Sequence, residues 1–135
     1  MPAKTWQQNM LGITFRYADG RITVFRSALE SIGRPEFYHF LYNPTKQMFA
    51  IQACGMDAEG ANRVPKKNQD DRYEIKSKGL VRLIYQSCGW DRTRSYRLPG
   101  VEYPQQRLVN YELCHAIPIF EGKVDKENES TQEQA

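Results

Sequence analysis

Polar and apolar residues alternate in two short runs near the start of the chain. The runs are Gly12–Tyr17 and Arg21–Phe25, and in both of them the alternation is that of a strand with one buried face. Asp19 and Gly20 stand between the two runs. An Asp-Gly pair favours a type I′ turn, because that turn needs positive φ angles at its central residues. The pattern therefore predicts a β-hairpin.

A short helix is predicted directly after this hairpin. Ser27 is a candidate N-cap, and Ala28, Leu29 and Ile32 have the spacing of one helical face. Gly33 is expected to end the helix, because glycine readily adopts the left-handed conformation that closes helices.

Two extended runs follow, over Glu36–Tyr42 and Gln47–Cys54, and both are rich in aromatic and aliphatic residues. Asn43 and Pro44 lie between them and favour a turn. The first half is therefore predicted to contain a strand, a short helix and a hairpin in that order.

The second half has a similar order of elements. Arg72–Lys76 alternates like a strand, Ser77 is a candidate N-cap, and a helix is expected up to Gly89. The apolar stripe of this helix consists of Leu80, Val81, Leu83, Ile84 and Cys88. The extended segments after it are Ser95–Leu98, a strand with Val101 and Tyr103 after a Pro99-Gly100 turn, and Arg107–Ile117, which Pro118 is expected to end.

These elements predict an α+β fold: a small, strand-rich domain with two strand–short helix–hairpin units that an internal pseudo-two-fold axis would relate. The length suits one domain. We expect this domain over residues 1–120, with halves of about 12–55 and 72–118 joined by a loop over 55–71. Residues 121–135 are polar and lack aromatic side chains, so they are predicted to be a disordered tail.

The predicted core consists of large apolar residues that the strand or helix period turns inward. They are Ile13, Phe15, Ile22, Val24, Leu29, Ile32, Phe37, Leu41, Phe49, Ile51, Leu80, Leu83, Ile84, Leu108, Leu113 and Ile117.

Positive charge is concentrated in the middle of the chain. Residues 63–107 carry eleven basic and five acidic side chains, whereas residues 121–135 carry two lysines and five acids. A basic segment of this kind suits a polyanionic or acidic partner, or is an ordinary solvated surface. No apolar run is long enough to span a bilayer, and the first ten residues do not resemble a signal peptide, so we expect a cytoplasmic protein.

The sequence contains no catalytic, phosphate-loop or metal-binding motif that we can identify, so we predict a non-enzymatic protein without metal or cofactor. His39 and His115 both lie in apolar, strand-like runs, where packed histidines are common. Cys114 and His115 would point to opposite faces of a strand. The three cysteines, Cys54, Cys88 and Cys114, are expected to be reduced.

Basic side chains interleaved with aromatic ones are the main functional signal. The candidate nucleic-acid-binding residues are Arg92, Arg94 and Arg97, with Arg63, Lys66 and Lys67 before them and Arg16, Arg21 and Arg26 on the first hairpin. Guanidinium groups suit phosphate and carboxylate alike. Trp90 and Tyr96 can stack on bases or anchor a partner. Alternatively, Trp90 packs under the helix end while the arginines pair with Asp91 and Glu102.

A family resemblance is carried by Arg21–Val24, by Ala28, Leu29, Ile32 and Gly33, and by the extended pair around Asn43 and Pro44. This stretch resembles the strand–helix–hairpin unit of the swapped-hairpin AbrB type, and two such units resemble the duplicated MraZ arrangement. The resemblance implies a β-rich DNA-binding domain in which basic residues of the first strand and helix approach DNA. The equivalent basic residues of the second half are Arg72, Lys76 and Lys78.

Two functions are consistent with these features. The first is a DNA-binding regulator of transcription, from a bacterium or a phage, that uses a basic β-surface. The second is a small inhibitor or adaptor that binds a larger protein and is encoded on a phage or another mobile element. In both cases a homodimer is an open alternative to a monomer.

Overall fold

The computed structural model describes residues 11–119 of the chain. The strands are β1 (Ile13–Arg16), β2 (Arg21–Phe25), β3 (Phe37–Asn43), β4 (Met48–Cys54), β5 (Asn62–Arg63), β6 (Arg72–Lys76), β7 (Ser95–Leu98), β8 (Val101–Tyr103), β9 (Leu108–Glu112) and β10 (Ile117–Ile119). The helices are α2 (Arg26–Ser31) and α3 (Lys78–Cys88), with the 3₁₀ turns η1 (Pro104–Gln106) and η2 (Leu113–His115). The tail expected over 121–135 lies outside the described residues.

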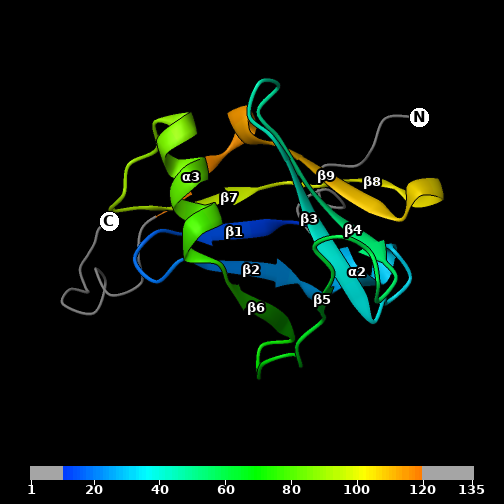
Figure 1. Cartoon of the computed structure of the whole chain (residues 1–135). Helices are drawn as coiled ribbons and strands as arrows, with labels where there is room; N and C mark the ends of the chain where they lie inside the picture. Colours follow the sequence, from blue (N-terminus) through cyan, green and yellow to red (C-terminus); the bar gives the residue numbers. More distant parts are fainter. Residues whose placement is uncertain (1–10, 120–135) are drawn as a thin grey trace, which may run out of the picture.

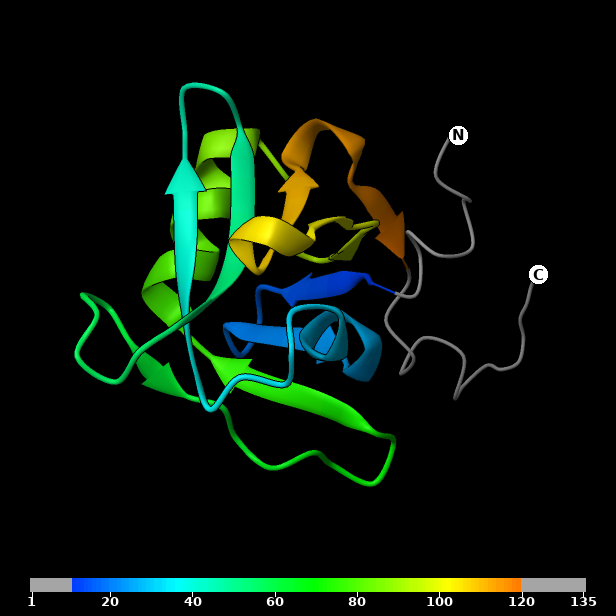
Figure 2. The ribbon, with the colours of Figure 1, turned by 90° about the vertical axis from the view of Figure 1, so that its right-hand side faces the viewer.

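The strands form two antiparallel sheets, which confirms the strand-rich α+β class. The first sheet has the order β10-β7-β1-β2-β6 and the second has the order β5-β3-β4-β9-β8. The two sheets pack against each other. At their contact the rings of Phe15 in β1 and Phe49 in β4 meet edge to face, with centroids 5.2 Å apart. In Figure 1, α3 and α2 lie at opposite ends of the strands. Figure 2 shows α3 beside the β3–β4 hairpin, where Gln47 Nε2 donates to the carbonyl of Ser87.

The turn between β1 and β2 is not the expected type I′ turn. It spans four residues, and of these only Gly20 has a positive φ, of 65°. The amide of Gly20 donates to the carbonyl of Tyr17 at 3.2 Å. A Cβ atom at Gly20 would lie 2.5 Å from Cα of Lys78, so the close approach of α3 also requires glycine here.

Both helices end at a left-handed glycine, as expected. Gly33 has a φ of 91° and Gly89 has a φ of 68°. The expected serine caps are different: the N-cap of α2 is Phe25, so Ser27 lies inside the helix. Ser77 does precede α3, but its side chain makes no capping hydrogen bond. Backbone geometry therefore begins these helices without help from a side chain.

The core lies between the two sheets and under α3. Ten of the residues expected in it are buried: Ile13, Phe15, Ile22, Val24, Leu29, Ile32, Phe49, Ile51, Ile84 and Leu113. On α3 the buried face consists of Val81, Ile84 and Tyr85. The hydroxyl of Tyr85 donates to the carbonyl of Arg94 at 2.6 Å, so this buried polar group is satisfied.

Six expected core positions are not fully buried. Phe37, Leu80 and Leu108 are partly exposed, and Leu41, Leu83 and Ile117 are exposed by 41%, 50% and 53% of their surface. In β3 the inward residues are Tyr38, Phe40 and Tyr42 instead. The strand has large apolar residues on both faces, so alternation alone does not determine which face is inward, and a shift of one residue exchanges the two faces.

The last expected strand is interrupted. β9 ends at Glu112, η2 follows, and the chain then enters β10, in which Pro118 is the central residue and not a terminator. Within residues 11–119, β10 pairs only with β7, so its proline lies on an edge strand, where a missing amide donor is tolerated.

Among residues 11–119 there is no helix of the length and apolarity that crossing a membrane requires.

Candidate nucleic-acid interface

The outer face of the first sheet carries most of the basic side chains of its strands. Inward residues such as Ile13, Phe15, Ile22 and Val24 are fully buried, so their neighbours along each strand point outward. We call these outward residues the basic sheet face: Thr14, Arg16, Arg21, Thr23, Phe25, Arg72, Glu74, Lys76 and Arg97. It has five cations and one acid.

Three of these cations lie side by side on adjacent strands. Arg16 of β1 is directly opposite Arg21 of β2, and Arg21 is directly opposite Lys76 of β6. Like charges in directly opposed positions are destabilising in an antiparallel pair. The row therefore needs an anion, from the chain itself or from a partner.

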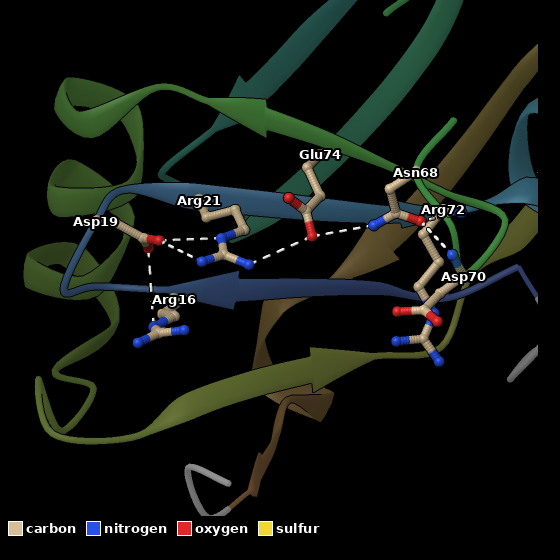
Figure 3. A network of polar contacts seen from close by, with 7 residues as sticks. All are labelled: Arg16, Asp19, Arg21, Asn68, Asp70, Arg72 and Glu74. Atoms are coloured by element: carbon tan, nitrogen blue, oxygen red, sulfur yellow. Dashed lines mark hydrogen bonds and ion pairs between the residues drawn. The ribbon is translucent and has the colours of Figure 1, made fainter. Parts of the chain in front are cut away.

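The chain itself supplies two carboxylates to this row of cations, those of Asp19 and Glu74 (Figure 3). Arg21 donates from Nε and Nη2 to Asp19 Oδ2 at 3.0 and 2.6 Å, and its Nη1 lies 3.3 Å from Glu74 Oε2. Burial opposes ionisation of Asp19, but the hydrogen bond and charge of Arg21, with the charge of Arg16, outweigh it and hold the pKa of Asp19 below its usual range. Asn68 Nδ2 donates to Glu74 Oε2 at 3.1 Å.

An aromatic ring lies at the other end of the same face. The guanidinium carbons of Arg72 and Arg97 are 5.0 and 5.2 Å from the ring centroid of Phe25, which is within the range of a cation–π interaction. Nε of Arg97 is buried and has no hydrogen-bond partner within the described part of the chain. Phe25 was not among the candidate residues, although its position in an alternating strand with Arg21 could have indicated it.

The sequence-based candidates are divided among several places. Arg16, Arg21 and Arg97 lie on the basic sheet face. Arg63 pairs with Glu36 at 2.9 Å, Arg26 pairs with Asp71 at 2.7 Å, and Lys67 pairs with Asp71 at 3.3 Å. Lys66 is an exposed loop residue. The structure therefore does not gather these nine residues into one site.

Arg92 and Arg94 lie in the loop between α3 and β7, where they do not share a direction. Arg94 pairs with Asp91 at 3.6 Å, whereas Arg92 lies over the ring of Tyr17 at 5.5 Å. Backbone and side-chain hydrogen bonds from Thr93 hold the pKa of Asp91 below its usual range.

Trp90 and Tyr96 are packed against each other and not presented to solvent as a pair. Their rings are stacked with centroids 4.4 Å apart, and Tyr96 is 9% exposed. The hydroxyl oxygen of Tyr96 accepts a hydrogen bond from the backbone amide of Asp91 at 2.9 Å. The ring of Trp90 also contacts the ring of Phe15. Tyr96 is therefore buried, whereas Trp90 is half-buried, and this packing agrees with the alternative in which Trp90 packs under the helix end.

Among the residues that the structure describes, one group of side chains has the donor atoms of a metal site. Glu112, Cys114 and His115 have ligand atoms that all lie within 4.8 Å of one another, and all three residues are exposed. Cys114 and His115 lie in η2 and not in a strand, so the expectation that they point to opposite faces was wrong. Nδ1 of His115 is 3.2 Å from Glu112 Oε1.

Comparisons with protein-family models, with curated proteins and with solved structures gave no significant match.

Proposed function

We propose that the protein is a non-enzymatic DNA-binding regulator and that the basic sheet face contacts the phosphate backbone. The observation that supports this most is the row of Arg16, Arg21 and Lys76 on three adjacent strands. A sheet surface with aligned cations suits a polyanion, because each phosphate that it neutralises releases counterions and adds to affinity.

The chemistry of the individual side chains suits phosphate. Arg16 and Arg21 have partly exposed side chains, at 38% and 29%. Arg21 already donates to Asp19 and Glu74. A guanidinium has five donors in a fixed fork, so Arg21 can share a remaining N–H group with a phosphate oxygen, or exchange Glu74 for it. Arg97 and Arg72 extend the surface along the strands, where successive outward residues are about 7 Å apart.

The AbrB/MraZ resemblance remains part of this proposal. β2 and β6 are the equivalent first strands of the two expected units, and they pair antiparallel with Thr23 opposite Glu74. Each strand leads into a helix that ends at a left-handed glycine. We propose that a pseudo-two-fold axis passes near this pair, and that the two units present their basic strands on one surface.

The proposal is tested by fluorescence anisotropy with a labelled duplex of random sequence. Arg16→Gln and Arg97→Gln each remove one cation from the basic sheet face, and we expect each to weaken binding several-fold at low salt. Lys46→Gln is the matched control, because it removes the same charge from the exposed β3–β4 turn. Equal weakening by all three variants would mean that only net charge matters.

A second candidate function, protein binding, is favoured by the outer face of the second sheet. This apolar sheet face is formed by Leu41, Met48, Ala50, Val101, Tyr103 and Leu108, which lie on β3, β4, β8 and β9. Leu41, Val101 and Tyr103 are exposed by 41%, 39% and 45%. A shallow hollow of about 240 Å³ lies over Leu41, Met48, Ala50 and Leu108.

We propose that the partner bound at the apolar sheet face is a second copy of the chain. Two basic sheet faces repel each other. On the apolar sheet face Leu41 lies opposite Ala50, and the charged residues on the same side of the sheet, Glu112 opposite Met48 and Arg63 opposite Phe37, lie toward its ends, so two copies can meet over the apolar centre. Sedimentation should then show a dimer that Leu41→Glu dissociates and Leu83→Glu, on the exposed side of α3, does not. A monomeric wild type would exclude this occupant and leave a different protein as the partner.

A further inference from the structure

A cavity of about 490 Å³ lies between α3, the loop after it and the β1–β2 turn. Its aromatic lining consists of Tyr17, Tyr85 and Trp90, which we call the aromatic floor. The other lining residues are Arg82, Gln86, Gly89 and Arg92. A hollow of this size that combines aromatic rings with a few converging polar groups suits a small molecule.

Two cations converge on this cavity from different elements. Arg82 comes from α3 and Arg92 from the following loop, and their guanidinium carbons lie 5.6 and 5.5 Å from the ring centroid of Tyr17. Neither residue forms an ion pair with a carboxylate of residues 11–119. This distinguishes them from Arg94, which pairs with Asp91 at 3.6 Å.

The floor of the cavity is held in place by packing and hydrogen bonds. The ring of Tyr85 lies 5.1 Å from that of Tyr17 and 5.2 Å from that of Trp90, centroid to centroid. Tyr85 is 2% exposed, and its hydroxyl donates to the carbonyl of Arg94 at 2.6 Å. The left-handed Gly89, with a φ of 68°, turns the chain so that Arg92 returns over Tyr17. The site is therefore largely formed before a ligand binds.

We propose that this cavity binds a small anionic ligand with a flat ring, of the nucleoside monophosphate class. Trp90 and Tyr17, the half-buried rings of the aromatic floor, suit the flat ring of the ligand. The two arginines suit the phosphate, which accepts charge-assisted hydrogen bonds from guanidinium groups. The C-terminal end of α3 disfavours a nearby anion, because the last carbonyls of a helix carry partial negative charge. Affinity must therefore depend on Arg82 and Arg92 together. The inference is independent of DNA binding by the basic sheet face.

Trp90 reports on the cavity directly, because it forms part of the floor. The chain has two tryptophans, and Trp6→Phe leaves Trp90 as the only one. We expect AMP to change the emission of Trp90 saturably, and adenosine and inorganic phosphate each to bind at least about tenfold more weakly, because each lacks one of the two groups recognised. Absence of a saturable change with AMP would overturn the proposal.

Variants separate a built site from diffuse positive charge. Arg82→Gln and Arg92→Gln should each weaken AMP binding about tenfold or more, the loss of a charge-assisted hydrogen bond. Arg94→Gln removes the same charge two residues from Arg92 and should leave AMP binding within about twofold, as should Arg16→Gln on the basic sheet face. If Arg94→Gln weakens binding as much as Arg92→Gln, the proposal fails. Thermal unfolding of each variant establishes that the fold is retained.

Discussion

Asp19 accepts two hydrogen bonds from Arg21, from Nε at 3.0 Å and from Nη2 at 2.6 Å. The same carboxylate lies 3.8 Å from Nε of Arg16, which faces Arg21 across the β1–β2 pair. One acid thus lies between two opposed cations, and it stabilises the fold while it reduces the positive charge of the basic sheet face.

Asp19→Asn is expected to change stability and DNA affinity in opposite directions. The folded state should lose about 1 kcal/mol, the usual size of a hydrogen bond to a charged group after discounting for partial exposure. DNA binding should become tighter, because the face gains one net positive charge. Urea unfolding and anisotropy measure the two effects. Asp57→Asn, an exposed loop residue, controls for net charge, and equal DNA affinities of the two variants would argue against the role given to Asp19.

Acid should remove the contribution of Asp19 to stability. The pKa of Asp19 is lower in the folded state than in the unfolded chain, so its stabilising effect is full above the unfolded value of about 3.9 and is lost as pH falls through the folded value. The difference in unfolding free energy between wild type and Asp19→Asn should therefore shrink below about pH 4. A difference that stays constant down to the acid limit would show that the ion pair is not its source.

Leu29 and Leu83 should respond very differently to truncation. Leu29 is 2% exposed in α2, so Leu29→Ala should destabilise the protein by about 2–5 kcal/mol. Leu83 is 50% exposed, so Leu83→Ala should change stability by less than about 1 kcal/mol. Urea denaturation measures both changes in unfolding free energy, and the m-value should be the same as that of the wild type. Similar losses for the two variants would mean that α3 packs in a different rotation.

Gly100 and Gly79 differ in the space around them, and alanine at each position tests the close packing at Gly100 against an open control. A Cβ at Gly100 would lie 2.7 Å from the carbonyl of Leu11 and 2.8 Å from the ring of Tyr111, so Gly100→Ala should cost about 1–3 kcal/mol. Gly79 in α3 has no atom within 4 Å of such a Cβ, and Gly79→Ala should stabilise by about 0.5–1 kcal/mol. Thermal unfolding of both variants gives the comparison, and stabilisation by Gly100→Ala would contradict the contact.

Most of the elements could be predicted from the sequence because turns and strand alternation are local properties. Arg21–Phe25, Arg72–Lys76 and the Gly89 helix end agree with the structure. The phase of β3 could not be predicted, because Leu41 and Tyr42 are both large and apolar, and only the packing of the second sheet decides which is inward. Leu83 was misplaced for a similar reason, since α3 buries Ile84 and Tyr85 beside it.

The site depended on long-range pairing, which a single sequence does not encode locally. That Arg21 lies between Arg16 and Lys76 follows from the pairing of β2 with both β1 and β6. The density of arginines in residues 92–97 indicated a basic surface, but it did not show that Arg92 lies over Tyr17 and Arg97 over Phe25.

The salt dependence of DNA binding tests the proposed function most directly. Each phosphate contact contributes about −0.9 to the slope of log affinity against log salt for duplex DNA. We expect a wild-type slope of about −3 or steeper, and a slope about two units shallower for the double variant Arg16→Gln, Arg97→Gln. The Lys46→Gln control should keep the wild-type slope. Wild-type binding that does not vary with salt, or an unchanged slope in the double variant, would contradict the assignment of the basic sheet face as a DNA-binding surface.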